Sequence, residues 1–421
     1  MFQNKTNIVN HKFIIFKVPE FPHLSETFII TQIVTAIELG YAIKIVTRRA
    51  IKENSSIALA IGKYNLLDHI MIEDYKIPER KAIRLFKWCL LLLSNLFHLK
   101  SIINFHIEFA KFSLSWLYQW HFYFQFNEAA IIHVQYGTNS YPYRVINYNN
   151  IFKPKVIVTF HGHDAFFPIY GHIQNNGYYK KLFTNSTLIT ANTPYLGQQL
   201  TDLGCLTEML KIVPVGVDTE FFNPTKKYRE TREALKLITV GRLDKVKGHF
   251  YCIEVVNELV KKGLNVSLTI IGEGSERLAL ETLIQQYRLE KYICLLGSKN
   301  AQEIRNELQV HDIYLLLAVP VDFERRESQG LATIEAQACG LPAIVFDSGG
   351  VKYTVQDEYS GFICGEFDIA AVVGKIILFS NNKLILQKMS KNAVNYINNV
   401  YSQKIISERW RIIYSSLSRK Y

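Results

Sequence analysis

The sequence predicts an α/β protein built from two doubly wound parallel sheets, because of a recurring pattern and the length of the chain. Short apolar, β-branched runs alternate with longer segments of helical spacing, and turns rich in Gly, Ser or His lie between them. Continuous apolar strands between helices are typical of parallel strands buried on both faces. The 421 residues are also too many for one ordinary core, so two or three domains are expected.

The expected strands form two sets separated by a polar segment. The first half contains strands at 13–18, 42–47, 131–135, 156–160, 188–191 and 211–215. The second half contains strands at 237–240, 267–271, 292–296, 313–317 and 343–346. The polar segment 223–233 is the expected hinge, and 402–418 has the apolar spacing of a final helix. The expected domains are therefore 1–225 and 226–400, with a C-terminal helix within 401–421.

Composition and charge exclude several classes of protein. With 48% hydrophobic and 20% charged residues, the chain is globular rather than disordered or fibrous. The net charge of +11 is spread over both halves without the basic block of a DNA-binding arm, so no nucleic-acid partner is expected. An even positive surplus suits anionic small molecules, or a bilayer surface with anionic lipids.

The cysteines and the apolar runs bear on the compartment. Six cysteines lie far apart with no C-x-x-C spacing, which indicates reduced thiols in a cytosolic protein. The N-terminus lacks the apolar core of a signal peptide, and no uninterrupted apolar run approaches the ~18–20 residues of a spanning helix. We expect a cytoplasmic protein, with or without peripheral contact with the cytoplasmic face of the inner membrane.

One segment has two interpretations. Residues 83–126 place Trp, Phe and Leu among the cations Lys87, Lys100 and Lys111. Either these residues form helices that pack on the first sheet, or they form an amphipathic face that enters the membrane interface, where aromatic and basic side chains are favoured.

Ligands of doubly wound sheets bind beyond the carboxyl ends of the strands, and a pair of acids marks one such place. Glu327 and Glu335 flank a turn that contains Gly330, and a helix is expected to begin near Leu331. Gly330 lets backbone N–H groups approach a ligand, and the helix adds its positive end. Carboxylates at this turn can accept hydrogen bonds from the paired hydroxyls of a sugar or ribose. The spacing alone also occurs by accident on charged surfaces.

A second turn supplies cations. Arg242 and Lys247 follow the strand at 237–240 and precede a helix expected near His249. A forked donor and a point charge at this place suit a diphosphate. The alternative is two solvated basic side chains on a turn. Two glycine pairs follow neighbouring strands: Gly272 and Gly274 could pass under a nucleotide, and Gly349 and Gly350 could present N–H groups to phosphate.

The first half offers polar residues after two of its strands. His161, His163 and Asp164 follow the strand at 156–160. We expect a neutral imidazole with its tautomer fixed by Asp164 or a backbone carbonyl. The alternative for one of the two histidines is a purely structural role. No metal site is expected, because successive strand-end residues point apart and no third ligand is evident.

Nearer the start, residues 25–27 precede a helix. Ser25 or Thr27 either caps that helix or also meets a substrate hydroxyl, and Glu26 lies between them.

In order along the chain, these motifs are S-E-T-F-I, F-H-G-H-D, G-V-D, G-R-L-x-x-x-K-G, G-x-G and E-x-x-G-L-x-x-x-E-A-x-A-C-G-L-P. The set resembles the family 4 retaining glycosyltransferases over about residues 13–361, and is most similar to bacterial enzymes of exopolysaccharide, capsule or O-antigen assembly. The resemblance implies a GT-B fold with two facing Rossmann-like domains and a C-terminal helix that crosses back to the first. It also implies a UDP- or GDP-linked sugar donor held by the second domain, a saccharide or lipid-linked acceptor held by the first, and no metal or other cofactor.

Residue roles follow from the same resemblance. Arg242 and Lys247 would neutralise the diphosphate, Glu335 would hold the ribose hydroxyls, and His161 would lie over the reacting sugar. Glu327 would meet the sugar hydroxyls, helped by the N–H groups of Gln329, Gly330 and Leu331. Ser25, Glu26, Thr27, His163 and Asp164 would lie on the acceptor side.

Two departures from the family pattern concern the donor. Val215 stands where the family often has Asn before Gly-Val-Asp, and Lys352-Tyr353 replaces a frequent Pro-Glu. The function implied is retaining transfer of a sugar in surface polysaccharide synthesis. The alternatives are an NDP-sugar 2-epimerase of the same fold and a non-catalytic sugar-nucleotide-binding subunit.

Overall fold

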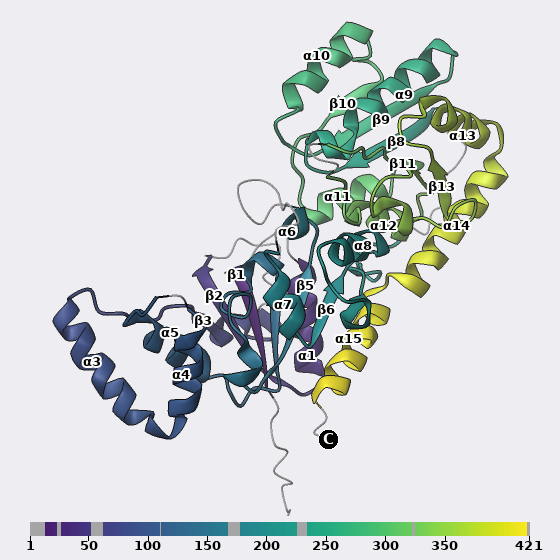
Figure 1. Cartoon of the computed structure of the whole chain (residues 1–421). Coiled ribbons are helices and arrows are strands. Elements are labelled where there is room, and N and C mark those ends of the chain that lie inside the picture. Colours follow the sequence, from purple (N-terminus) through teal and green to yellow (C-terminus); the bar gives the residue numbers. More distant parts are fainter. Residues whose placement is uncertain are drawn as a thin grey trace, which may run out of the picture. The chain divides into compact units, whose positions relative to one another are not determined.

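The computed structural model describes residues 13–22, 27–51, 62–109, 111–166, 177–224, 234–321 and 325–418. The chain forms two compact units (Figure 1). The N-terminal unit consists of Met1–Ala191, Gln199–Lys211 and Ser407–Tyr421, and the C-terminal unit consists of Asn192–Gln198 and Ile212–Ile406. Residues 192–198 already belong to the C-terminal unit, and the chain then passes between units after 211 and after 406, whereas the sequence predicted boundaries at 225 and 400. The earlier crossing arises because Val217 already pairs with Ser402 in the C-terminal unit.

The N-terminal unit is built on a seven-stranded sheet in the order β3-β2-β1-β4-β5-β6-β7. Pairs β1–β2, β1–β4, β2–β3, β4–β5 and β5–β6 are parallel. Its strands are β1 (Phe13–Phe21), β2 (Ala42–Ala50), β3 (Ile70–Ile72), β4 (Ile131–Gln135), β5 (Lys155–Phe160), β6 (Leu188–Ala191) and β7 (Leu210–Ile212). The helices of this unit are α1 (Thr27–Glu38), α3 (Lys81–Ser94), α4 (Leu99–Ile107), α5 (Ser115–Phe124), α6 (His163–Phe166) and α7 (Lys180–Asn185). Helix α8 (Pro194–Asp202) contributes residues to both units.

The C-terminal unit is built on a six-stranded parallel sheet in the order β10-β9-β8-β11-β12-β13. Its strands are β8 (Leu235–Val240), β9 (Val266–Ile271), β10 (Ile293–Leu295), β11 (Ile313–Leu316), β12 (Ala343–Phe346) and β13 (Gly361–Cys364). The helices are α9 (His249–Lys261), α10 (Arg277–Tyr287), α11 (Ala301–Leu308), α12 (Leu331–Ala338), α13 (Ile369–Asn381) and α14 (Lys383–Val400). Buried Val, Ile and Leu from strands and helices fill the core on both faces of the sheet.

All eleven predicted strands are confirmed to within a few residues, and β4, β6 and β12 match the predicted bounds. The sequence analysis missed β3 and β13, which occupy outer positions in their sheets. Strand β3 has only three residues, and β13 has four and begins with a glycine, so neither has an apolar run as long as those that marked the other strands.

The last helix, α15 (Gln403–Ser418), packs its second part within the N-terminal unit. Trp410 and Tyr414 are buried there, and Nδ1 of His133 on β4 lies 2.9 Å from the Tyr414 hydroxyl. Thr35 on α1 and Ser407 share a further hydrogen bond of 3.0 Å. Apolar and polar contacts together hold this helix on the sheet.

The segment 83–126 divides between its two interpretations. Helix α5 buries Leu117, Trp120 and Tyr123, and the Tyr123 ring contacts the ammonium of Lys17 on β1, so packing on the sheet is confirmed for this helix. Helix α3 buries no residue, so the packing interpretation is wrong for it. Figure 1 shows α3 standing away from the seven-stranded sheet, connected to it through α4 and α5.

No single helix among the described residues is long and apolar enough to cross a membrane. Two pairs of consecutive helices reach that length and composition only when the two helices of a pair are counted as one, and each pair is bent. These pairs are 81–94 with 96–107 and 369–381 with 383–400.

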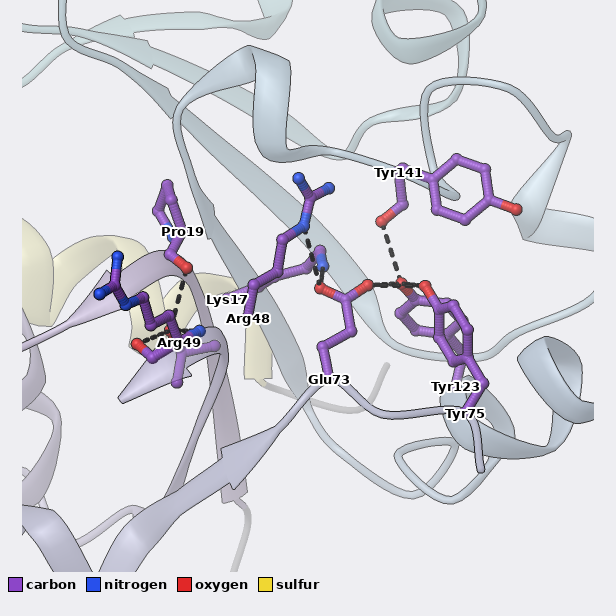
Figure 2. Close-up of polar contacts among 9 residues, drawn as sticks. Lys17, Pro19, Arg48, Arg49, Glu73, Tyr75, Tyr123 and Tyr141 are labelled. Atoms are coloured by element: carbon purple, nitrogen blue, oxygen red, sulfur yellow. Dashed lines mark hydrogen bonds and ion pairs between the residues drawn. The ribbon is translucent and has the colours of Figure 1, made fainter. Parts of the chain in front are cut away.

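A buried ion pair lies just after β3, where the chain leaves the sheet toward α3 (Figure 2). The ammonium of Lys17 on β1 contacts the carboxylate of Glu73, just after β3, and both side chains are almost fully buried. Burial lowers the pKa of Lys17, and Glu73 offsets only part of that effect. Burial acts to raise the pKa of Glu73, but the contact with Lys17 and the hydroxyls of Tyr123 and Tyr75 outweigh it, so this pKa lies below its ordinary value.

The two tyrosines extend this network to α5. Tyr75 donates to Glu73 at 2.8 Å, and Tyr123 of α5 also donates to this carboxylate (Figure 2). Arg48 approaches the same carboxylate at 3.8 Å from β2. The network thereby ties the segment that leads into α3 to both the sheet and α5.

Candidate active site

The candidate donor residues gather at one edge of the six-stranded sheet. Because β8, β9, β11 and β12 are parallel, their carboxyl ends lie at the same edge. The turn with Arg242 and Lys247 follows β8, the Gly272–Gly274 turn follows β9, and Gly349 and Gly350 follow β12. Glu327 lies between β11 and α12.

An ion pair joins the cation turn to the acid motif. Lys247 Nζ lies 2.8 Å from Glu327 Oε2, and the two side chains are only 19% and 18% exposed. Partial burial strengthens such a contact relative to an exposed pair. The structure therefore brings together two residues that the sequence assigned to one site.

Local geometry fixes the position of Lys247. It ends a short 3-10 turn, η6 (Lys245–Lys247), whose start is capped by the Asp244 side chain accepting from Val246 N at 3.1 Å. Gly248 follows with φ 68°, and a Cβ there would lie 1.7 Å from the carbonyl oxygen of Leu317. Only glycine fits this close backbone approach. Helix α9 then begins at His249, as predicted.

The carboxylate of Glu327 is held by backbone as well as by Lys247. Gly330 N donates to Oε1 at 3.2 Å, and the N–H of Gln329 also faces the group. Burial acts to raise the pKa of Glu327, but Lys247 and the two N–H groups outweigh it, so this pKa lies below its ordinary value and the group is ionised. The predicted helix start at Leu331 is confirmed. Of the three N–H groups expected to help bind the sugar, those of Gln329 and Gly330 face this carboxylate.

Glu335 is in a different state. It lies on α12, and burial raises the pKa of its carboxyl group to about 7. None of the described residues donates a hydrogen bond to this group, so no fixed partner offsets the burial. Hydroxyl donors from a ligand would stabilise its ionised form.

Arg242 is exposed, and its guanidinium forms no ion pair with the residues that the structure describes. Its carbonyl oxygen accepts from Asp244 N at 2.8 Å and lies 3.3 Å from His249 Nε2, which fixes the backbone of the turn. The side chain therefore projects from an anchored backbone and is available to an anion.

The glycines act mainly through close backbone packing. A Cβ on Gly272 would lie 1.9 Å from the carbonyl oxygen of Gly241, and one on Gly274 would lie 2.3 Å from that of Leu243. The turns after β8 and β9 thus lie backbone to backbone. Gly350 N donates to the carbonyl oxygen of Glu327 at 2.8 Å, so the prediction that this N–H is open to phosphate is wrong.

Gly349 also supports the acid motif. It has φ 52°, and a Cβ there would lie 2.5 Å from the carbonyl oxygen of Glu327. Nearby, Lys352 is paired with Asp347 at 2.8 Å. Lys352, which departs from the family pattern, therefore forms an ion pair with a carboxylate of the same loop.

Sequence reasoning named Gln329 for its backbone N–H only, and it missed the role of the Gln329 side chain and the residues Asn192 and Thr193, which hold the acid motif. The buried side chain of Gln329 donates to Val215 O at 2.9 Å and accepts from Val215 N at 3.0 Å. Thr193 donates to the carbonyl oxygen of Ser328 at 2.8 Å, and Asn192 Nδ2 donates to Ser328 Oγ at 2.7 Å. The one available signal was the position of Asn192 directly after the strand at 188–191. At Val215 the backbone makes the contact, so the loss of the family's Asn side chain does not remove it.

In the N-terminal unit, His161 is positioned by a neighbouring strand. Its Nε2 lies 2.9 Å from Oε1 of Gln135, the last residue of β4. Its ring lies 4.6 Å, centroid to centroid, from both Phe28 and Tyr136. Burial lowers the pKa of His161 to about 3, so the imidazole is neutral. The tautomer is set by Gln135, which corrects the prediction that Asp164 or a backbone carbonyl sets it.

Asp164 closes the turn after β5 instead. Its carboxylate accepts from the backbone N–H groups of His161 at 2.9 Å, Gly162 at 3.0 Å and Gly137 at 2.7 Å. Burial raises its pKa to about 6 despite these bonds. His163 is exposed at the start of α6, so the structure separates the environments of the two histidines.

The remaining acceptor-side residues are Ser25 and Glu26, which lie outside the described residues, as does the side chain of Thr27. Helix α1 begins at Thr27.

Two parallel sheets flanked by helices define the chain as a protein of the GT-B fold class, and solved structures agree on that fold. A glycosyltransferase from Rickettsia africae aligns with a TM-score of 0.68 at 16% identity, over 97% of this chain and all of that one. Anabaena Alr3699/HepE in complex with UDP aligns with a TM-score of 0.69 at 14% identity, over 96% of this chain and all of that one.

Sequence comparison identifies the family. The family model described as Glycosyltransferase Family 4 matches residues 76–221, and the model described as Glycosyl transferases group 1 matches residues 222–396. Together the two models cover about three quarters of the chain without a gap. The chain belongs to the family 4 glycosyltransferases, as its motifs predicted.

Three named relatives share 26–29% identity with this chain. Amylovoran biosynthesis glycosyltransferase AmsK of Erwinia amylovora is 26% identical over 87% of this chain and 90% of AmsK. The putative colanic acid biosynthesis glycosyltransferase WcaL of Escherichia coli K12 is 27% identical over 61% of this chain and 63% of WcaL. An Escherichia coli UDP-Gal:alpha-D-GlcNAc-diphosphoundecaprenol alpha-1,3-galactosyltransferase is 29% identical over 46% of this chain and half of the relative.

Proposed function

We propose that this glycosyltransferase moves a sugar from a nucleoside diphosphate to a saccharide or lipid-linked acceptor in bacterial surface polysaccharide synthesis, with retention at the anomeric carbon and without a metal. The contact between Lys247 and Glu327 carries the proposal, because it joins a phosphate-binding cation to a hydroxyl-binding carboxylate. Two relatives are named for amylovoran and colanic acid biosynthesis, and a third for transfer from UDP-Gal to a diphosphoundecaprenol-linked acceptor. These names support a polysaccharide role and a lipid-linked acceptor.

The chemical problem is to break the bond between an anomeric carbon and a phosphate. Negative charge grows on the departing diphosphate while the sugar becomes oxocarbenium-like. Arg242 and Lys247 supply fixed positive charge at that phosphate, the task that a metal performs elsewhere. Because this charge is largest in the transition state, the cations stabilise it more than the ground state. Removal of one such group typically costs about 3–4 kcal/mol.

The other groups orient the donor and the acceptor. Glu327, fixed by two N–H groups, accepts hydrogen bonds from hydroxyls of the sugar, and Glu335 accepts hydrogen bonds from hydroxyls of the ribose. Neutral His161 donates its Nε2 proton to Gln135, so its Nδ1 is left as the acceptor. We assign no protein nucleophile: the acceptor hydroxyl attacks from the face that the diphosphate leaves, and its proton passes to that phosphate.

A nucleotide-sugar donor fits a location in the cytoplasm, and a lipid-linked acceptor fits peripheral contact with the membrane.

A panel of UDP- and GDP-linked sugars tests the proposal. The correct donor should raise the melting temperature, since a ligand at 100 times its Kd stabilises the fold by about 2.7 kcal/mol. With diphosphate-linked lipid acceptors, that donor should then yield product of unchanged anomeric configuration, also after chelation of divalent ions.

Isomerised sugar released without an acceptor would replace the proposal with an epimerase. Donor binding with neither transfer nor isomerisation across the panel would replace it with a binding subunit.

A further inference from the structure

The chain concentrates its exposed apolar side chains in one small region. Of the large hydrophobic side chains exposed in the described part of the chain, half lie within residues 83–112. Phe97 is fully exposed, and Phe86 and Leu93 are 65% and 62% exposed. We call the surface of α3, the 3-10 turn η2 (Leu96–His98) and α4 the α3–α4 face. Contiguous exposed apolar surface of this kind marks a place that contacts another molecule or a membrane.

The charges of this face are all of one sign. Residues 80–107 contain no Asp or Glu, and their cations are Arg80, Lys81, Arg84, Lys87 and Lys100. The next acid, Glu108, is paired with Lys181 at 2.8 Å. Lys and Arg interleaved with Phe, Leu and Trp are typical of helices that lie at the surface of an anionic bilayer. A second copy of this face would instead oppose cations with cations.

The dimensions favour a helix pair that lies in the interface rather than across the membrane. Helix α3 has 14 residues, about 21 Å at 1.5 Å per residue, which is shorter than a hydrocarbon core of about 30 Å. The chain bends by 78° between 81–94 and 96–107. Neither arm alone spans a bilayer, but together they present apolar side chains over a broad surface.

Hydrogen bonds fix the α3–α4 face to the rest of the N-terminal unit. The Tyr118 hydroxyl of α5 donates to the carbonyl oxygen of Arg84 in α3 at 2.7 Å. Trp120 Nε1 donates to Ser101 Oγ on α4 at 2.9 Å, and Ser101 donates to Ile151 O at 2.9 Å. The buried Glu73 network also holds the segment that leads into α3, so the α3–α4 face is anchored to the N-terminal unit by several contacts (Figures 1 and 2).

We propose that the α3–α4 face docks on an anionic lipid bilayer, with Phe86, Leu93 and Phe97 entering the boundary between head groups and acyl chains. Lys87 and Lys100, with the other cations of the face, contact the lipid phosphates. This docking is independent of the donor chemistry, because it uses no residue of the donor site. It names the surface through which the N-terminal unit would meet a lipid-linked acceptor.

Vesicle flotation of the full chain tests the proposal. Vesicles of phosphatidylcholine alone are compared with vesicles that also contain phosphatidylglycerol, at low and high salt. We expect binding to the anionic vesicles that weakens with salt. The variant Phe86→Ser/Leu93→Ser/Phe97→Ser should lose about tenfold or more of this binding, and Lys87→Gln/Lys100→Gln about fivefold or more. The matched control is Leu278→Ser/Leu384→Ser, which changes two residues of the C-terminal unit that are 74% and 77% exposed and should bind as wild type.

Three results would overturn the proposal: no binding to anionic vesicles, equal binding to both vesicle types, or unchanged binding by the triple apolar variant. Concentration-dependent association without vesicles, lost in the triple variant, would assign the face to a second copy of the chain. The melting-temperature response to nucleotide sugars should be the same in wild type and the triple variant, which separates failed docking from a failed donor assignment.

Discussion

The ammonium of Lys247 and the carboxylate of Glu327 lie 2.8 Å apart in a partly buried contact at the carboxyl edge of the six-stranded sheet. The proposed function gives these groups different tasks, one on the diphosphate and one on the sugar. Because each now neutralises the other, a bound diphosphate competes with Glu327 for the ammonium. The two N–H groups at the start of α12 keep the carboxylate in place when Lys247 turns to the phosphate.

The ion pair predicts different effects for its two members. Lys247→Ala should lower both the affinity for nucleoside diphosphate and kcat, the latter by about a hundredfold or more. Glu327→Gln should lower kcat by a similar factor, yet leave the affinity for the bare diphosphate equal or higher, because the competitor for Lys247 is weakened. Calorimetric titration and steady-state kinetics measure the two quantities.

Lys245→Ala is the matched control for this pair, because Lys245 is an exposed lysine of the same turn. It should leave both parameters near wild type. Weaker diphosphate binding by Glu327→Gln than by Lys247→Ala would contradict the assigned roles.

Glu335 predicts a pH-dependent stability. Its folded pKa of about 7 lies above its ordinary value of 4.5, so folding favours the protonated form. The associated stability is fully present below about pH 4.5 and is lost as the pH rises through about 7. Glu335→Gln should therefore resemble wild type near pH 4.5 and be more stable by about 3 kcal/mol above pH 7. Denaturant unfolding at several pH values measures the difference, and equal stability at pH 8 would refute the burial effect.

The same group links nucleotide binding to pH. Ribose hydroxyls that donate to Glu335 favour its ionised form, so wild-type affinity should increase as the pH rises through about 7. The diphosphate also titrates, so part of the pH dependence of the affinity comes from the ligand. Only that part should remain in Glu335→Gln. A pH profile of affinity identical in the two proteins would remove Glu335 from the ribose site.

The buried pair of Lys17 and Glu73 predicts large effects on stability. Glu73→Gln should destabilise the N-terminal unit by about 3–5 kcal/mol, because it leaves a buried ammonium without its counter-ion. The double variant Lys17→Met/Glu73→Leu should lie closer to wild type than either single change. The folded pKa of Glu73 is lowered, so its stability is present above its unfolded pKa and is lost as the pH falls through the folded value. Thermal unfolding of wild type, Lys17→Met, Glu73→Leu and the double variant would contradict this account if the losses of the two single variants were additive.

Gly248 predicts a sharp steric limit. Gly248→Ala should cost about 3 kcal/mol or more, because the added Cβ would lie 1.7 Å from the carbonyl oxygen of Leu317. Gly263→Ala is the control: its φ of 76° is similar, but no atom lies within 4 Å of the added Cβ, so only the backbone cost of about 1–2 kcal/mol is expected. Equal losses in denaturant unfolding would show that backbone conformation, and not the close approach, requires glycine at 248.

The sequence alone determined the strands and the helix starts that build the donor edge. Strands β4, β6 and β12 were predicted to the residue because each is a short, mostly apolar run, which is typical of a strand buried on both faces. The starts of α9 and α12 were predictable because each follows a glycine in the left-handed region. The family motifs placed Lys247, Glu327 and Glu335 in one unit.

Only the tertiary structure decided which groups meet. Lys247 reaches Glu327, Gln135 sets the tautomer of His161, and Gln329 holds Val215 through contacts between residues far apart in the chain. Local propensity does not encode such distances. The apolar spacing of α3 is also the same whether the helix is buried or exposed, and only its packing revealed a helix without a buried residue. The physical reason is that sequence patterns record what a side chain prefers, whereas the fold determines which partners are within reach.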